Sequence, residues 1–138
     1  MSDNELERIR QEKIKKLMQQ TQTTTTQEAI INIDSMTTYQ KLIKEHPEKV
    51  MVLDFWAEWC GPCKMFGPIF KKLSEEFQEN FIFGKVNVDQ NKQLAAQFRV
   101  SSIPSTVFLK QGKVIKKLVG ALGYQNLKTI LQKLKNSG

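Results

Sequence analysis

Two cysteines are present in the 138-residue chain, and both lie in the stretch WCGPC, residues 59–63. This stretch follows the strongly apolar run 50–57, which predicts a buried strand leading directly into a helix. Cys60 would then stand at the start of that helix, where unpaired backbone N–H groups and the helix dipole favour negative charge. We therefore expect Cys60 to ionise more readily than a free thiol, and thiolate is the attacking species in disulfide exchange.

The second cysteine, Cys63, lies three residues further along the same helix face. From there it can attack a mixed disulfide at Cys60 and release the bound partner. Gly61 lets another backbone approach, and Pro62 is tolerated in a first helical turn. Trp59, beside a sulfur that we expect to be exposed, offers a flat apolar docking surface. The spacing therefore predicts a reversible dithiol–disulfide couple with Cys60 as nucleophile and Cys63 as resolving thiol.

The cysteine pair has other possible uses. A closed zinc site takes four ligands, whereas the sequence offers two cysteines and the distant His46, so no metal site is expected. Inert buried cysteines remain an alternative, although Gly-Pro at a helix start is a poor place to bury sulfur. A structural disulfide is disfavoured because such bonds are rare in reducing compartments.

Asp54 is a further candidate for chemistry, six residues before Cys60 and inside the apolar run. A carboxylate in such a strand loses hydration, so its pKa should be raised unless a partner compensates.

Composition limits the other possibilities. With 40% hydrophobic and 25% charged residues, the chain fits one compact domain. The net charge of +7 comes from lysines spread along the chain with few aromatics among them, which argues against a nucleic-acid partner. No apolar stretch approaches the roughly 20 residues of a membrane helix, and the start MSDNELERIR is unlike a secretory signal. We expect a cytoplasmic protein that binds no membrane.

The sequence divides near residue 28. Residues 2–20 carry an apolar stripe with helical spacing, and residues 19–27 form a polar run without one. Residues 1–27 are therefore predicted to be an amphipathic helix with a flexible linker, followed by a compact domain at 28–138. The helix could pack on a partner or on the domain itself.

Within the domain, strand-like and helix-like patterns alternate. Strands are predicted at 29–33, 50–57, 81–89, 105–110 and 113–120, and helices at 35–46, 61–77, 91–99 and 124–135. A Gln-Gly pair at 111–112 predicts a hairpin, so the sheet should be mixed. Because the run 50–57 is apolar almost throughout, helices should cover both faces, giving an α/β fold with three α/β/α layers.

The stretch WCGPCK, residues 59–64, resembles the active-site signature of the thioredoxin family. The likeness extends over about residues 28–135. It includes KVNVDQN after the helix, Pro68 where the family has a helix-kinking proline, and SSIPST, where the family carries a cis-proline at Pro104. Two departures are Gly67, where alanine is frequent, and Ser105, where threonine is frequent.

The resemblance implies a thioredoxin-like fold and a docking groove for client proteins. It assigns Asp54 as the buried acid of the family and Lys85 as its accompanying lysine. We hypothesise that Asp54, through water, takes the proton of Cys63; alternatively, Asp54 and Lys85 only satisfy each other as a buried pair. The substrate-binding residues expected from the motif and the resemblance are Trp59, Gly61, Pro62, Ile103, Pro104, Val119, Gly120 and Ala121.

The function that these features favour is that of a protein-disulfide reductase and electron carrier of cell redox homeostasis. It would reduce client disulfides and be recycled by a separate thioredoxin-reductase-type enzyme. The glycines form no phosphate-cradling pattern, so we expect no bound cofactor besides the redox-active disulfide. A monomer is expected. The alternatives are a disulfide oxidase or isomerase, and a thioredoxin-like binding scaffold that would keep its function without Cys60 and Cys63.

Overall fold

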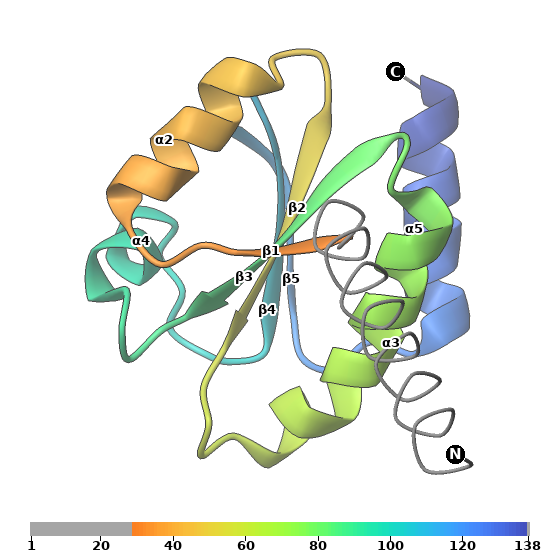
Figure 1. Ribbon diagram of the computed structural model, residues 1–138. Coiled ribbons are helices and arrows are strands. Elements are labelled where there is room, and N and C mark those ends of the chain that lie inside the picture. Colours follow the sequence, from red (N-terminus) through yellow and green to blue (C-terminus); the bar gives the residue numbers. More distant parts are fainter. Residues whose placement is uncertain (1–28, 138) are drawn as a thin grey trace, which may run out of the picture.

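The computed structural model describes residues 29–137, so the helix predicted within residues 1–27 lies outside the described residues (Figure 1). A five-stranded sheet forms the centre, with the strand order β1-β3-β2-β4-β5. β1 and β2 both run parallel to β3, whereas β4 is antiparallel to β2 and to β5. The predicted mixed sheet is confirmed. The strands are β1 (Ile30–Asn32), β2 (Val50–Trp56), β3 (Phe81–Asn87), β4 (Ser105–Lys110) and β5 (Lys113–Val119).

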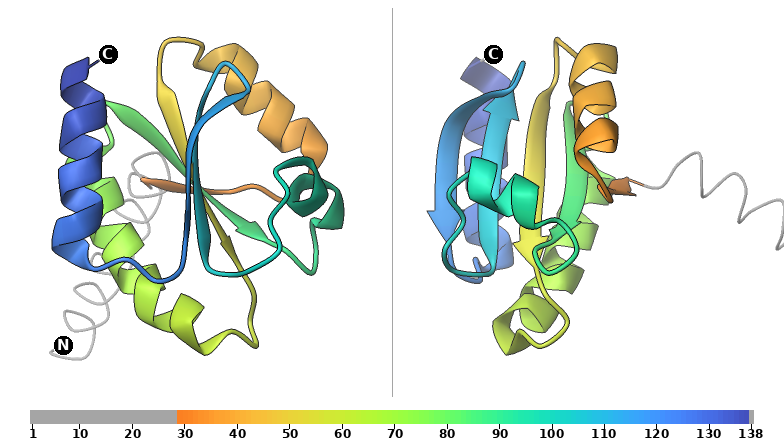
Figure 2. Two further views of the ribbon diagram at one scale, coloured as in Figure 1. Left: turned by 180° about the vertical axis from the view of Figure 1, so that it is seen from behind. Right: turned by 90° about the vertical axis from the view of Figure 1, so that its left-hand side faces the viewer.

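Helices cover both faces of the sheet, as Figure 1 shows with the sheet seen nearly edge-on. α2 (Met36–Glu45) and α4 (Lys92–Gln97) pack on one face, and α3 (Gly61–Phe77) and α5 (Tyr124–Ser137) pack on the other. Figure 2 gives two further views of the same layers. The predicted three-layer α/β/α arrangement is confirmed, with an apolar core on each side of the sheet.

The first core lies under α2 and α4 and includes Tyr39, Leu42, Leu94 and Phe98. The second lies under α3 and α5, whose buried side chains follow helical spacing. From these two helices it includes Phe66, Phe70, Leu73, Phe77, Leu127 and Leu131.

β2 is the central strand, and its apolar sequence explains its position. Five successive residues, 51–55, are almost fully buried between β3 and β4. Close packing at the neighbouring Gly84 supports this position, because an added Cβ there would lie 2.7 Å from Ile33 Cδ1 and 2.9 Å from Leu53 Cδ2. The fixed strand carries Asp54 and, four residues after its end, Cys60 into one region of the molecule.

Local side-chain chemistry sets several element ends. Ser35 caps α2 by accepting a hydrogen bond from the Thr38 N–H at 3.2 Å. β3 ends at Asn87, two residues earlier than predicted, because the Asn87 Oδ1 accepts a hydrogen bond from the Asp89 N–H and turns the chain. The predicted hairpin is present, with residues 111 and 112 both at positive φ.

Candidate active site

Cys60 is the N-cap residue of α3, at the carboxyl end of the central strand. Its Sγ accepts a hydrogen bond from the Cys63 N–H at 3.3 Å, which satisfies one of the free N–H groups of the first helical turn. The Cys60 N–H donates in turn to the Ala57 carbonyl at 3.2 Å. In the reduced protein this position would stabilise a thiolate through the helix dipole and a charge-assisted hydrogen bond.

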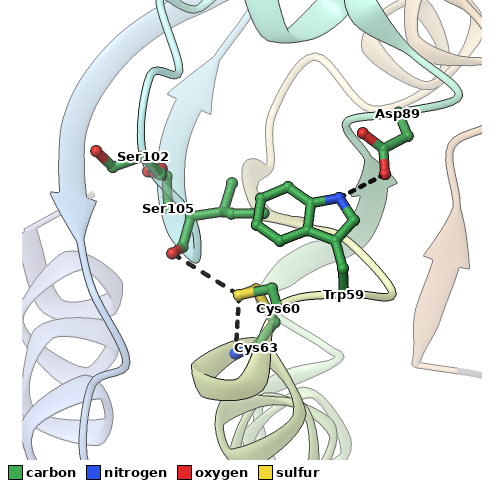
Figure 3. Close-up of a disulfide and its surroundings, with 7 residues drawn as sticks. Trp59, Cys60, Cys63, Asp89, Ser102 and Ser105 are labelled. Carbon is green, nitrogen blue, oxygen red and sulfur yellow. Dashed lines mark hydrogen bonds between the residues drawn. A yellow bond between two sulfur atoms is a disulfide. The ribbon is translucent and has the colours of Figure 1, made fainter.

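Cys60 and Cys63 are joined by a disulfide in this structure, with their Cα atoms 5.3 Å apart (Figure 3). The two residues are only 4% and 5% exposed. The expectation of an exposed sulfur is therefore wrong, because Trp56, Ala57 and Ile103 pack against the pair. Both cysteines are buried, as the alternative of two inert thiols required. They are nevertheless joined in a disulfide, so they are not inert thiols.

On one side of the disulfide lies the loop that contains Ile103 and Pro104. The peptide bond between these residues is cis, as the resemblance implied. The Ile103 carbonyl oxygen lies 3.8 Å from Cys60 Sγ. The Pro104 carbonyl accepts a hydrogen bond from the Gly120 N–H at 2.7 Å, which brings the loop and the end of β5 together. The loop beside Cys60 is thus joined to the chain that follows β5.

Two large apolar residues that adjoin Cys60 and Gly120 in the sequence are exposed. Trp59 is 70% exposed, and its Nε1 donates a hydrogen bond to Asp89 Oδ2 at 2.8 Å (Figure 3). Val119, next to Gly120, is 61% exposed. Gly61, Pro62 and Ala121 are also exposed. Asp89 was missed as a site residue, although it follows the Asn87 turn at the end of β3, in the stretch KVNVDQN.

A groove of about 790 Å³ lies on the other side, where Cys63 forms part of its wall. Trp56 and Lys85 reach it from β2 and β3, and Gly67 from α3. No sequence motif indicated this groove. Its remaining lining residues are Ala29, Ile30, Asn32, Lys64, Pro68, Lys71, Ser74 and Glu75.

Asp54 is the buried ionisable group near this groove. It is 1% exposed and stands in register with Lys85 on β3 and Thr106 on β4. Burial raises the pKa of Asp54 to about 7, while the positive charge of Lys85 offsets part of this rise. Its Oδ1 has no hydrogen-bond partner among residues 29–137. Such a carboxyl can gain or lose a proton near neutral pH.

Lys85 is placed differently from the simple buried pair that was one alternative. Its ammonium lies 4.7 Å from the centroid of the Trp56 ring, in a cation–π contact. In the described part of the chain, ion pairs within 4.0 Å join Lys41 to Glu45 and Lys128 to Glu76, and neither involves Asp54. Lys85 therefore influences the carboxyl through its electric field rather than through a direct ion pair.

Residues 29–137 contain no cluster of three or more His, Cys, Asp or Glu placed to bind a metal ion. His46 is the C-cap residue of α2, and its N–H donates to the Leu42 carbonyl. No helix in this described range has the length and apolar character needed to span a membrane.

Known proteins match both the sequence and the geometry. The family model described as thioredoxin matches residues 29–133. A thioredoxin of Chlorobaculum thiosulfatiphilum is 44% identical over 75 residues, which cover 54% of this chain and 69% of that protein. Thioredoxin-1 of Caenorhabditis elegans is 40% identical over 84 residues, covering 61% and 72%.

Solved structures agree with these sequence matches. The crystal structure of a Malassezia sympodialis thioredoxin superposes with a TM-score of 0.70 at 36% identity, covering 77% of this chain and 90% of that one. A Fasciola hepatica thioredoxin gives 0.69 at 34% identity, covering 75% and 97%. Together with the disulfide at the N-terminus of α3, these matches show that the chain belongs to the thioredoxin family and is a thiol–disulfide oxidoreductase with protein-disulfide reductase activity.

Proposed function

We propose that this oxidoreductase works as a reducing dithiol carrier, with Cys60 as the nucleophile and Cys63 as the resolving thiol. The observation that carries the proposal is the position of Cys60 Sγ, which caps α3 and faces the Ile103 carbonyl. A thiolate there is stabilised by the helix start, and a client disulfide can be held beside it by backbone groups of the loop.

In the first step, the Cys60 thiolate attacks one sulfur of a client disulfide. A bond forms between Cys60 and that sulfur, the client S–S bond breaks, and the second client sulfur leaves as a thiolate. Trp59 and Val119 offer exposed apolar area for the client, and their exposure supports that role.

In the second step, Cys63 loses its proton and attacks Cys60 Sγ. The Cys60–Cys63 disulfide forms as the bond between Cys60 and the client sulfur breaks, and that sulfur leaves as a thiolate. The client has gained two electrons, and its two thiolates take up protons from solvent. We assign the proton to the carboxylate of Asp54, reached through water in the groove. The pKa of Asp54, raised to about 7 by burial, supports this assignment because an efficient general base titrates near the working pH.

Recycling completes the proposal. A separate thioredoxin-reductase-type enzyme would return two electrons and two protons to the disulfide, so that the protein serves as an electron carrier with no cofactor other than its cysteine pair. Client proteins with disulfides are the other partners. We place this cycle in the cytoplasm, because a reducing compartment keeps the Cys60–Cys63 couple supplied with electrons. We also propose that the protein works as a monomer.

The test is the equilibrium reduction potential of the couple, titrated in a thiol/disulfide buffer and followed by the fluorescence of Trp56 and Trp59. We expect a value at or below the cytosolic glutathione poise of about −220 to −260 mV. A strongly oxidising value, near about −120 mV, would instead make the protein a disulfide donor and overturn the reducing role.

A further inference from the structure

β5 and the residue that follows it, Gly120, hold the loop beside Cys60 at two points, one at each end of the loop. At the end near β4, the Gly120 N–H donates to the Pro104 carbonyl at 2.7 Å. At the end near α4, the Lys117 ammonium donates to the Phe98 carbonyl at 3.1 Å and also to the Arg99 carbonyl. Residues 117–120 thus bond to both the first and the last residues of the segment 98–104.

The end near α4 needs such a donor. The last carbonyls of a helix lack partners within the helix, and a cation near a helix C-terminus is favoured by the dipole. Arg99 has φ 53°, in the left-handed region that residues other than glycine seldom adopt. The Arg99 N–H donates to the Ala96 carbonyl at 3.1 Å and the Val100 N–H to the Ala95 carbonyl at 2.8 Å. The N–H groups of this turn are paired locally, and Lys117 supplies a donor for its carbonyls.

The loop between these two points carries the backbone that faces the disulfide. Its start is fixed in the core, where the Phe98 ring packs edge-on against the rings of Tyr39 and Phe55 at centroid distances of 5.4 and 5.9 Å. Ser101 and Ser102 are exposed, and the Ile103 carbonyl follows at 3.8 Å from Cys60 Sγ. Residues 100–102 alone separate Arg99 from Ile103 in the sequence. A shift of the Arg99 turn is therefore transmitted to the Ile103 backbone through this short segment.

We propose that Lys117 is a positioning residue for client binding: it holds the Arg99 turn so that the Ile103–Pro104 backbone is preorganised beside Cys60. This inference rests on the proposed function, in which protein clients dock on that backbone. Within residues 29–137, the hydrogen bonds of the Lys117 ammonium go to the carbonyls of Phe98 and Arg99, so Lys117 acts through the loop. Its loss should weaken the binding of protein clients, which pair with the loop, and leave the attack of Cys60 on a small disulfide reagent unchanged.

The experiment compares Lys117→Met with Lys117→Arg, which keeps a cationic donor, and with Lys116→Met. Lys116 is the adjacent exposed lysine of β5, and successive side chains of a strand point to opposite faces of the sheet. Three quantities are measured: KM and kcat for the reduction of insulin, the rate of reaction with dithiobis-nitrobenzoate, and amide hydrogen exchange of residues 100–103. Thermal unfolding shows that each variant is folded.

We expect Lys117→Met to raise KM for insulin about threefold with little change in kcat, and to speed exchange in residues 100–103 by a similar factor. Lys117→Arg and Lys116→Met should stay close to wild type in both respects. The reaction with the small reagent should be the same in all four proteins.

Three results would overturn the inference. They are an unchanged KM and exchange rate in Lys117→Met, an equal effect of Lys116→Met, and a slower reaction of Lys117→Met with the small reagent. The last two would indicate a general charge effect on Cys60 instead of a loop effect. If the wild-type protein reduces no insulin at all, the proposed function fails, whereas the exchange comparison between Lys117→Met and Lys117→Arg still decides whether Lys117 holds the loop.

Discussion

The two sides of the disulfide differ in the chemistry that they present. On the loop side, Cys60 faces the Ile103 carbonyl, with exposed Trp59 and Val119 nearby. On the groove side, Cys63 shares a wall with Lys85, whose positive charge acts on the carboxyl of Asp54. The loop side offers backbone groups and apolar area, whereas the groove side holds charge under restricted solvation.

The two sides of the disulfide therefore have different roles in one active site: the loop side binds the client, and the groove side handles the proton. Apolar surface and backbone hydrogen-bond groups recognise an unfolded or extended client without demanding a particular sequence. A buried carboxyl with a shifted pKa manages a proton near neutral pH. Substitutions on the two sides should therefore have separable effects, on client binding in one case and on proton-linked behaviour in the other.

The largest effect on the rate of disulfide reduction is expected from substitutions of the two cysteines, which lie between the loop side and the groove side. Cys60→Ser should lower the rate of disulfide reduction by at least about a thousandfold, because a serine hydroxyl does not ionise near neutral pH. Cys63→Ser should still attack but remain attached to its client as a mixed disulfide. Insulin reduction and mass spectrometry of the trapped adduct measure the two outcomes. Turnover by Cys60→Ser would contradict the order of attack.

The next effect concerns stability on the groove side. Asp54→Asn should raise the free energy of unfolding at pH 8.5 by about 2 to 4 kcal/mol, because each pH unit between the two pKa values of a group corresponds to about 1.4 kcal/mol. Chemical denaturation across pH 4 to 9 measures the difference. Asp89→Asn, at an exposed carboxylate, is the matched control and should show no comparable gain.

The sign of this pH dependence follows from the raised pKa. Asp54 titrates near 3.8 when unfolded and at about 7 when folded. Below the lower value both states are protonated, and ionisation has no effect on stability. Between the two values the folded state keeps a proton that the unfolded state has lost, so wild-type stability falls as pH rises. Above about 7 the penalty is complete. A stability gain from Asp54→Asn that was the same at pH 4 and pH 8.5 would contradict this account.

A smaller effect is expected on the loop side. Trp59→Ala should raise KM for insulin roughly tenfold, since a docked tryptophan commonly contributes more than about 1 kcal/mol to an interface. Stability should change little, because the side chain is 70% exposed. Ile115→Ala serves as the control. It also removes an exposed apolar side chain, but from β5, five residues before Gly120. Equal effects of the two substitutions would mean that Trp59 has no special role.

The smallest effect is expected on the pKa of Asp54 when the positive charge of Lys85 is removed. Lys85→Met should raise the pKa of Asp54 further, by less than about one unit, because a positive charge that favours the carboxylate is lost. Carbon NMR of labelled aspartate measures the titration directly. Lys71→Met, which also lines the groove, is the control. A lowered pKa of Asp54 in Lys85→Met would contradict the assigned direction.

Much of the fold could be predicted from patterns local to the chain. The apolar run of β2 and the 111–112 hairpin each depend on neighbouring residues, and the structure confirms both. The bounds of α3, Gly61–Phe77, also agree with the prediction, since its apolar spacing and Pro62 mark a helix start.

What the sequence could not supply are contacts between distant segments. The burial of both sulfurs depends on Ile103, about 40 residues away from Cys60. Likewise, the placement of Lys85 over Trp56 and the bonds of Lys117 to the Arg99 turn arise from strand pairing and loop packing. The resemblance to the family singled out Lys85 but did not indicate where its ammonium points.

The proton transfer from Cys63 to Asp54 is the central claim, and the pH dependence of mixed-disulfide resolution tests it most directly. A reporter thiol is attached to Cys60, and its release is followed by stopped-flow between pH 5 and 9 in wild type, Asp54→Asn and Trp59→Ala. We predict that the rate rises through an inflection near pH 7 in wild type and in Trp59→Ala, whereas Asp54→Asn is slower and lacks that inflection. An Asp54→Asn profile that superposed on the wild-type profile would contradict the account.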